Sequence, residues 1–136
     1  MLFSGSEQLP VALADAVASA DAAFTPSQAL MAALEQVGEM LADRVAPHAA
    51  QRRAIAKSSA ELQERERTKF AAVAEAIDAA LRQRGVAPST AGLLADVGVA
   101  IFRTAFGRWV DEPDAGTLPN RLREAATELT AAFEAR

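Results

Sequence analysis

Few side chains in this sequence could carry out covalent or metal chemistry. The 136 residues include no cysteine, no tyrosine and a single histidine, His48. Without cysteine there can be no disulfide scaffold, no Cys-ligated zinc site and no cysteine nucleophile. The chain also lacks a His-x-x-x-His pair, a Gly-x-Ser-x-Gly motif and a glycine-rich phosphate loop. We therefore expect no catalytic residue, no metal site and no cofactor, and we predict that the protein is not an enzyme.

One acid-rich loop is the alternative starting point for chemistry. Asp111, Glu112 and Asp114 surround Pro113, and carboxylates of this kind can bind a hard cation. The regular ligand spacing of a calcium loop is missing, however. An enzyme hypothesis would rest on this loop alone.

The charge of the chain is acidic and unevenly distributed. The net charge is −4 and the isoelectric point is about 5.0, whereas a domain that binds DNA unaided is normally basic. Residues 51–85 carry eight bases and five acids, with Arg65, Arg67 and Lys69 interleaved with glutamates. This pattern is typical of a solvated helix face with ion pairs between adjacent turns. The alternative is that one or two of these bases bind a phosphate or carboxylate.

The composition predicts an all-α fold in a single domain, residues 1–136. Hydrophobic residues make up 51% of the chain, and alanine, the best helix former, is very common. No apolar stretch reaches the roughly 18 residues of a membrane span, and no basic segment precedes an apolar run at the N-terminus. We therefore expect a cytoplasmic protein without membrane contact.

Turn and capping residues divide the chain into about six helices. Ser6, Thr25 with Gln28, Ser58 or Ser59, and Ser89 or Thr90 are the expected N-caps, and Gly85 is the expected helix-ending glycine. The expected helices cover approximately residues 6–21, 26–47, 48–57, 59–84, 90–110 and 118 onwards.

The helix at 90–110 is apolar on more than one side, so we expect a second copy of the chain to cover part of it. Small residues there and in the last helix would allow close approach, and two such helices from each chain would form a four-helix bundle around a two-fold axis. The alternative is that alanine is simply abundant in this chain. The predicted homodimer interface comprises Leu94, Gly98, Ile101, Ala105, Trp109, Leu122, Ala126, Leu129 and Phe133.

A second group of apolar residues at helical spacing could line a cavity between helices, as bundles often do. Arg65 and Lys69 precede Phe70 and could meet the polar or anionic end of a small-molecule ligand. The alternative is a filled core in a structural helical adaptor. The predicted ligand-binding residues are Met31, Leu34, Leu41, Ile55, Arg65, Lys69, Phe70, Val73, Phe102 and Phe106.

Three stretches of the sequence carry a family resemblance. Residues 2–9 (LFSGSEQL) resemble the Tyr-Phe-x-Ser-Lys-Glu-x-Leu segment that follows the recognition helix in TetR-family transcriptional regulators, with Leu2 in place of Tyr and Ser6 in place of Lys. Residues 52–70 (RRAIAKSSAELQERERTKF) and 101–112 (IFRTAFGRWVDE) resemble the arginine-rich helix and the dimerisation hairpin of the branch that binds acyl-CoA-like ligands.

This resemblance implies the C-terminal ligand-binding and dimerisation domain of a TetR-like transcriptional repressor. Such a regulator binds DNA through an N-terminal helix-turn-helix head, so we expect residues 1–5 to be the remnant of the linker from a head that this chain lacks. The resemblance further implies that a small apolar or amphipathic effector, such as an acyl-CoA-like molecule, releases the full-length protein from DNA by a population shift.

Overall fold

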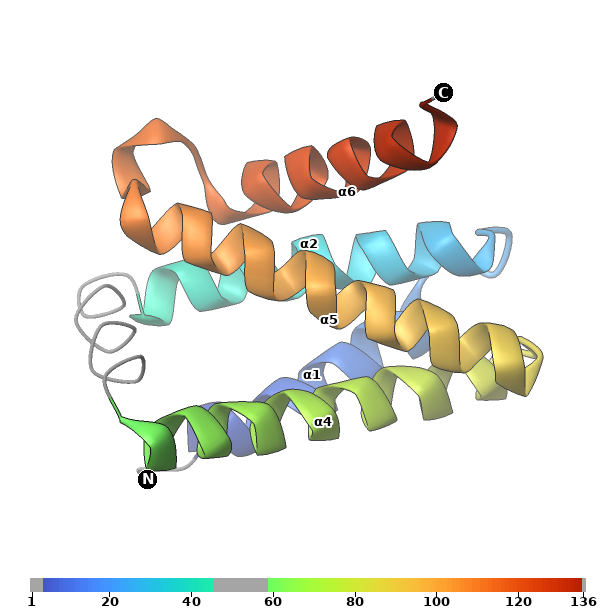
Figure 1. Cartoon of the computed structure of the whole chain (residues 1–136). Coiled ribbons are helices and arrows are strands. Elements are labelled where there is room, and N and C mark those ends of the chain that lie inside the picture. The colour runs from blue at the N-terminus through green and yellow to red at the C-terminus, as the bar shows by residue number, and fades with distance from the viewer. Residues whose placement is uncertain (1–3, 46–58, 136) are drawn as a thin grey trace.

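A computed structural model of the chain describes residues 4–45 and 59–135 (Figure 1). Within these residues the chain is helical and has no strand, which confirms the predicted fold class. The elements are α1 (Ser4–Ser19), α2 (Pro26–Val45), α4 (Ala60–Gln83), α5 (Pro88–Asp111), the 3-10 helix η2 (Pro113–Ala115) and α6 (Leu118–Glu134).

The helices stack in three layers. In Figure 1, α1 and α4 form one outer layer, α2 and α5 lie in the middle, and α6 forms the opposite outer layer. The core lies between these layers because each helix turns an apolar face inward. Its largest fully buried side chains are Leu13, Leu30, Leu34, Ile77, Leu81, Leu118, Leu122, Val17, Val37 and Val73.

Helix boundaries follow local capping chemistry. The Thr25 hydroxyl accepts a hydrogen bond from the Gln28 amide (3.2 Å) while the Gln28 side chain accepts one from the Thr25 amide (2.8 Å), which confirms the predicted capping box. Ser59 caps α4 by accepting from the Leu62 amide. Gly85 follows α4 with a φ of +96°, as predicted for a helix-ending glycine that adopts the left-handed conformation.

Two predicted helix starts are wrong. α5 begins at Pro88 with Ala87 as its cap, because proline has the helical φ built in and needs no capping partner for its missing N–H. Neither Ser89 nor Thr90 therefore serves as the cap. α1 begins at Ser4, so Ser6 lies inside the helix instead of before it.

The expected helix at 48–57, which includes His48 and Ile55, lies outside the described residues. The described part of the chain contains five α-helices, so the predicted count of six depends on that segment.

α5 is long and apolar enough, by length and composition alone, to cross a membrane (mean hydropathy 1.3). A core helix of a bundle meets the same criterion, and nine residues of α5 are buried in this chain. We therefore describe α5 as a core helix.

Candidate ligand-binding site

Four aromatic rings form a continuous row along α5 and across to α4. The centroids of Phe70 and Phe102 are 6.1 Å apart, those of Phe102 and Phe106 6.0 Å, and those of Phe106 and Trp109 5.8 Å. These separations are typical of favourable aromatic pairs. The sequence spacing explains the row, because residues three and four apart share one face of a helix.

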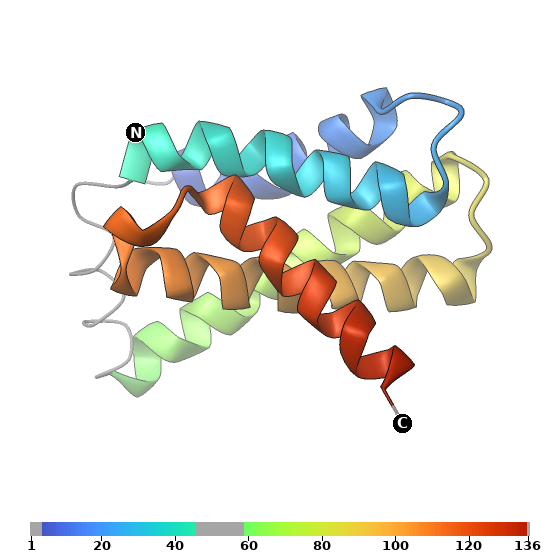
Figure 2. The ribbon, with the colours of Figure 1, turned by 90° about the horizontal axis from the view of Figure 1, so that it is seen from above.

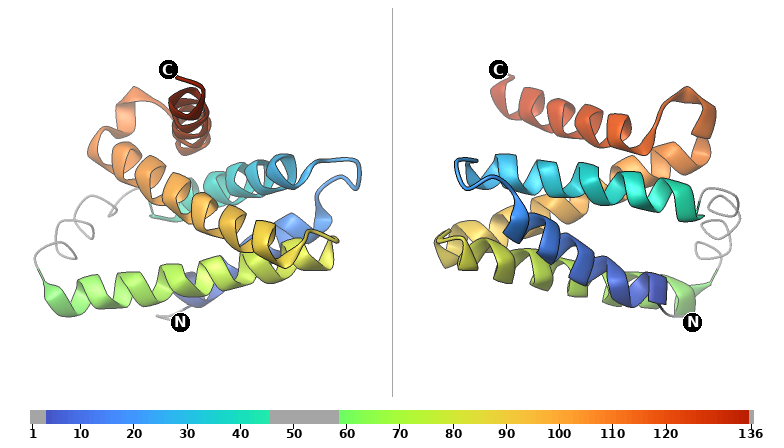
Figure 3. Two further views of the ribbon diagram at one scale, coloured as in Figure 1. Left: turned by 45° about the vertical axis from the view of Figure 1, so that its right-hand side comes forward. Right: turned by 180° about the vertical axis from the view of Figure 1, so that it is seen from behind.

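The row lies where α4 and α5 move apart. The two helices meet at the turn around Gly85 and diverge towards the start of α4 and the end of α5, as Figures 1 and 3 both show. Phe70 is the first buried residue of α4, and Phe102 is also buried. Phe106 is only half-buried and therefore forms the accessible part of the row.

Two cationic groups approach the ring of Phe70. The Lys69 Nζ atom lies 5.1 Å from the ring centroid and the Arg103 Cζ atom lies 5.5 Å from it. Both distances fall within the range of a cation–π interaction. Lys69 also forms an ion pair with Glu66 at 3.0 Å, so its charge is partly compensated.

The structure brings together only part of the predicted ligand-binding set. Phe70, Val73 and Phe102 are buried in the core. Phe70 of α4 contacts Phe102 of α5, and Phe106 lies beside Phe102. Leu34 is fully buried in α2, and Met31 and Leu41 are half-buried against the same core.

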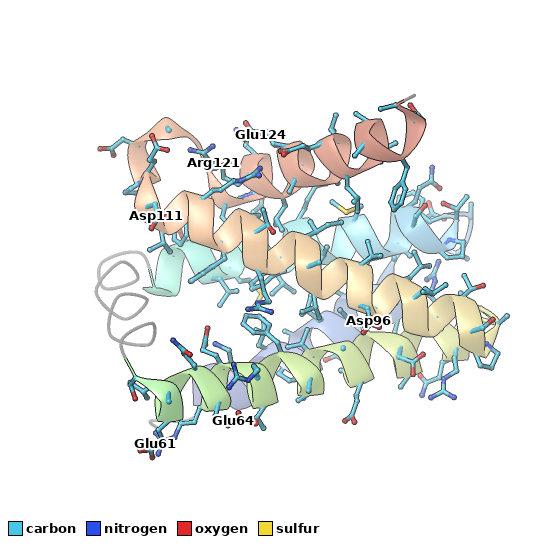
Figure 4. All side chains as sticks on the ribbon, in the orientation of Figure 1. Glu61, Glu64, Asp96, Asp111, Arg121 and Glu124 are labelled. Carbon is cyan, nitrogen blue, oxygen red and sulfur yellow. The ribbon has the colours of Figure 1, made fainter. Side chains whose placement is uncertain are left out.

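Arg65 does not join this group. Its side chain is 72% exposed and pairs with Glu61 at 3.3 Å, one turn away on the same helix. Figure 4 shows Glu61 and Glu64 projecting from the first turns of α4, away from α5. The first half of α4 thus carries a solvated, ion-paired face, which is the interpretation that the sequence pattern favoured over phosphate or carboxylate binding.

Arg103 is the residue that the sequence analysis missed. It follows Phe102 directly and precedes Phe106 by three residues, and no acid lies three or four residues from it on α5. The sequence already contained this signal: an arginine with no acid three or four residues away lacks the usual ion-pair partner on its own helix. Its position over Phe70 depends on how α4 packs against α5.

Five residues of the predicted dimer interface instead face the core of a single chain. Ile101, Ala105, Trp109 and Leu122 are between 0% and 6% exposed. Gly98 is also buried, and a Cβ atom added there would lie 2.9 Å from Cδ1 of Leu30. These positions are therefore covered within one chain, because α2, α5 and α6 pack against one another.

The remaining interface candidates are more accessible. Leu94, Ala126 and Leu129 are half-buried, and Phe133 is 81% exposed. In Figure 2, α6 crosses α5 obliquely and its C-terminal end extends beyond the other helices. The apolar seam of α6 therefore continues past the part of the helix that the chain itself covers.

The structure leaves little of the uncovered apolar surface that the sequence predicted for α5. Most of its large apolar side chains are buried or pack half-buried against the core, and Leu93, at 68% exposed, is the clear exception. The outward face of α5 also carries the exposed residues Asp96, Ala100, Arg103 and Thr104.

Acidic residues offer no comparable site. Asp111 ends α5, and Asp114 lies in η2. Among the described residues, no group of three or more His, Asp or Glu side chains is arranged to hold a metal ion. A shallow depression on the outer face of α6 includes Arg123 and Glu128, which already form ion pairs with Glu35 and Arg108.

Neither the family models nor the curated proteins compared with this chain match it.

Proposed function

We propose that this chain is the effector-binding and dimerisation domain of a TetR-like transcriptional regulator. The effector is a small apolar or amphipathic molecule, and its binding releases the full-length protein from DNA. The family assignment rests on the three stretches of sequence resemblance.

The observation that carries ligand binding is the aromatic row from Phe70 to Trp109. It lies where α4 and α5 diverge. The half-buried ring of Phe106 is its accessible part, and the cationic side chains of Lys69 and Arg103 lie over the ring of Phe70 at one end of the row. Small-molecule sites are mostly apolar and aromatic, with a few polar groups that fix the ligand's orientation. This combination supports an amphipathic effector.

Dimerisation is supported by the C-terminal half of α6. Phe133 is a large aromatic side chain exposed to solvent, and the half-buried Leu129 lies one turn before it on the same face. A second copy of the chain would cover this surface. The dimer in this proposal is centred on Phe133 and Leu129, whereas Trp109 belongs to the core.

Light scattering tests the dimer. The wild-type chain should have about twice the monomer mass of 14.3 kDa at micromolar concentration, and Phe133→Ser should shift it towards the monomer. Val11→Ser is the matched control, because Val11 is also an exposed apolar residue (60%) but lies on α1, in the opposite layer. A monomeric wild-type chain would contradict the dimer.

Thermal unfolding tests effector binding. An apolar small molecule such as decanol should raise the melting temperature, because a ligand that binds only the folded state stabilises it.

The second candidate function is a structural helical adaptor with a filled core. The direct contact of the buried rings of Phe70 and Phe102 favours it, because rings that already pack together leave no space between them. An unchanged melting temperature with decanol would support this alternative.

A further inference from the structure

Arg103 stands apart from the other arginines in the described part of the chain. Every other arginine whose side chain the structure describes has a hydrogen-bond acceptor, either a carboxylate or backbone carbonyls. Arg103 has only the ring of Phe70, at 5.5 Å. A guanidinium has five N–H donors suited to carboxylate or phosphate oxygens, and an aromatic face satisfies none of them.

No carboxylate among the described side chains pairs with Arg103. Residues 46–58, the internal segment outside the described residues, contain no Asp or Glu. Near the ring of Phe70, Glu66 pairs with Lys69. The exposed guanidinium of Arg103, which has no ion-pair partner among the described side chains, can therefore meet an anion beside the aromatic row.

Arg103 is also placed next to the accessible part of that row. On α5 it adjoins Phe102 in sequence and lies one turn from the half-buried ring of Phe106. A ligand with an apolar tail against Phe106 could thus place an anionic head at Arg103. A charge-assisted hydrogen bond of this kind is roughly twice as strong as a neutral one.

We propose that the effector is an amphipathic anion, with a carboxylate-type head bound by Arg103 and an apolar tail against Phe106. This inference rests on the proposed effector-binding function and specifies the chemical class of the effector. Lys69 contributes a second positive charge at the ring of Phe70, where Arg103 also lies, whereas Arg65 takes no part.

The test compares two probes that differ only in the head group, decanoate and decanol. The chain has one tryptophan, Trp109, whose ring centroid is 5.8 Å from that of Phe106, so its fluorescence reports on this site. The melting temperature of the same samples provides a second measurement. We expect decanoate to bind at least about tenfold more tightly than decanol.

Arg103→Gln should remove this preference and leave decanol binding unchanged. Arg103 is exposed, so this variant should fold. Arg67→Gln is the matched control, because Arg67 is an exposed arginine that pairs with Glu64 on α4, and it should keep the preference.

Equal binding of the two probes, or an unchanged preference in Arg103→Gln, would overturn the anionic head and leave effector binding intact. An equal loss in Arg67→Gln would also overturn it, because the preference would then reflect net charge alone. Binding of neither probe would overturn both this inference and the effector-binding function.

Discussion

Arg84, which follows the last residue of α4, caps the C-terminal end of α1. Its guanidinium donates hydrogen bonds to the backbone carbonyls of Val17 (3.1 Å), Ala20 (2.9 Å) and Asp21 (2.8 Å). The carbonyls at a helix C-terminus lack partners within the helix and carry partial negative charge, so a cation there is favourable. One side chain therefore holds two helices that are distant in sequence.

We expect Arg84→Ala to lower the free energy of unfolding by about 2–3 kcal/mol, because hydrogen bonds to a charged group are lost from a partly buried position. Urea denaturation measures this change. Arg82→Ala is the control: Arg82 is an exposed arginine two residues earlier that pairs with Asp78, and its loss should cost about 0.5 kcal/mol or less. Equal effects of the two substitutions would show that the contact with α1 is unimportant.

The packing of α5 against α2 requires a residue without a side chain at one position. A Cβ atom on Gly98 would lie 2.9 Å from Cδ1 and 3.4 Å from Cδ2 of Leu30, and Leu30 is only 2% exposed. Gly92 lies on the same helix, yet a Cβ atom there would meet nothing within 4 Å. The two glycines thus differ in their packing against neighbouring side chains.

This difference predicts opposite effects of the same substitution. Gly92→Ala should stabilise the chain by up to about 1 kcal/mol, because alanine has the higher helix propensity. Gly98→Ala should destabilise it, because overpacking a core costs about 1–3 kcal/mol and exceeds that gain. Chemical denaturation of both variants measures the effects, and stabilisation by both would mean that Leu30 moves aside freely.

At the scale of the whole molecule, ion pairs help to attach α6 to the layers beneath it. Arg108 of α5 donates hydrogen bonds to both carboxylate oxygens of Glu128 on α6, at 2.9 and 3.3 Å. The hydrogen bond and the positive charge of Arg108 lower the pKa of Glu128 below its ordinary value. Glu128 reciprocally raises the pKa of Arg108.

The lowered pKa of Glu128 sets the sign of a pH dependence. A carboxyl group whose pKa is lower in the folded state stabilises the fold above its unfolded pKa, and this contribution is lost as the pH falls through the folded pKa. The wild type should therefore have the higher free energy of unfolding at neutral pH. Its value and that of Glu128→Gln should converge when the pH falls below the ordinary pKa range of glutamate. Denaturation at several pH values tests this.

The matched background for this test is Arg108→Met. In that background, Glu128→Gln should no longer change the pH dependence, because the partner of the carboxylate is absent. A persistent difference would assign the effect to another group. High salt should also weaken the effect, since both side chains are exposed.

The sequence by itself determined the helical elements and several of their ends. Apolar residues three and four apart predicted the buried faces, and the capping box at Thr25 and the glycine at Gly85 predicted boundaries that the structure confirms. These features depend on contacts between residues close in the chain. The start of α5 was misjudged because Pro88 makes a capping side chain unnecessary.

Only the tertiary structure decided which partner each apolar face meets. Periodicity shows that Ile101 and Trp109 must be covered, but a neighbouring helix of the same chain and a helix of a second chain bury them equally well. Likewise, the sequence places Arg65 and Arg103 on helices without showing that one pairs with Glu61 and the other lies over Phe70. The physical reason is that helix formation is local, whereas the choice of partner depends on how distant helices pack.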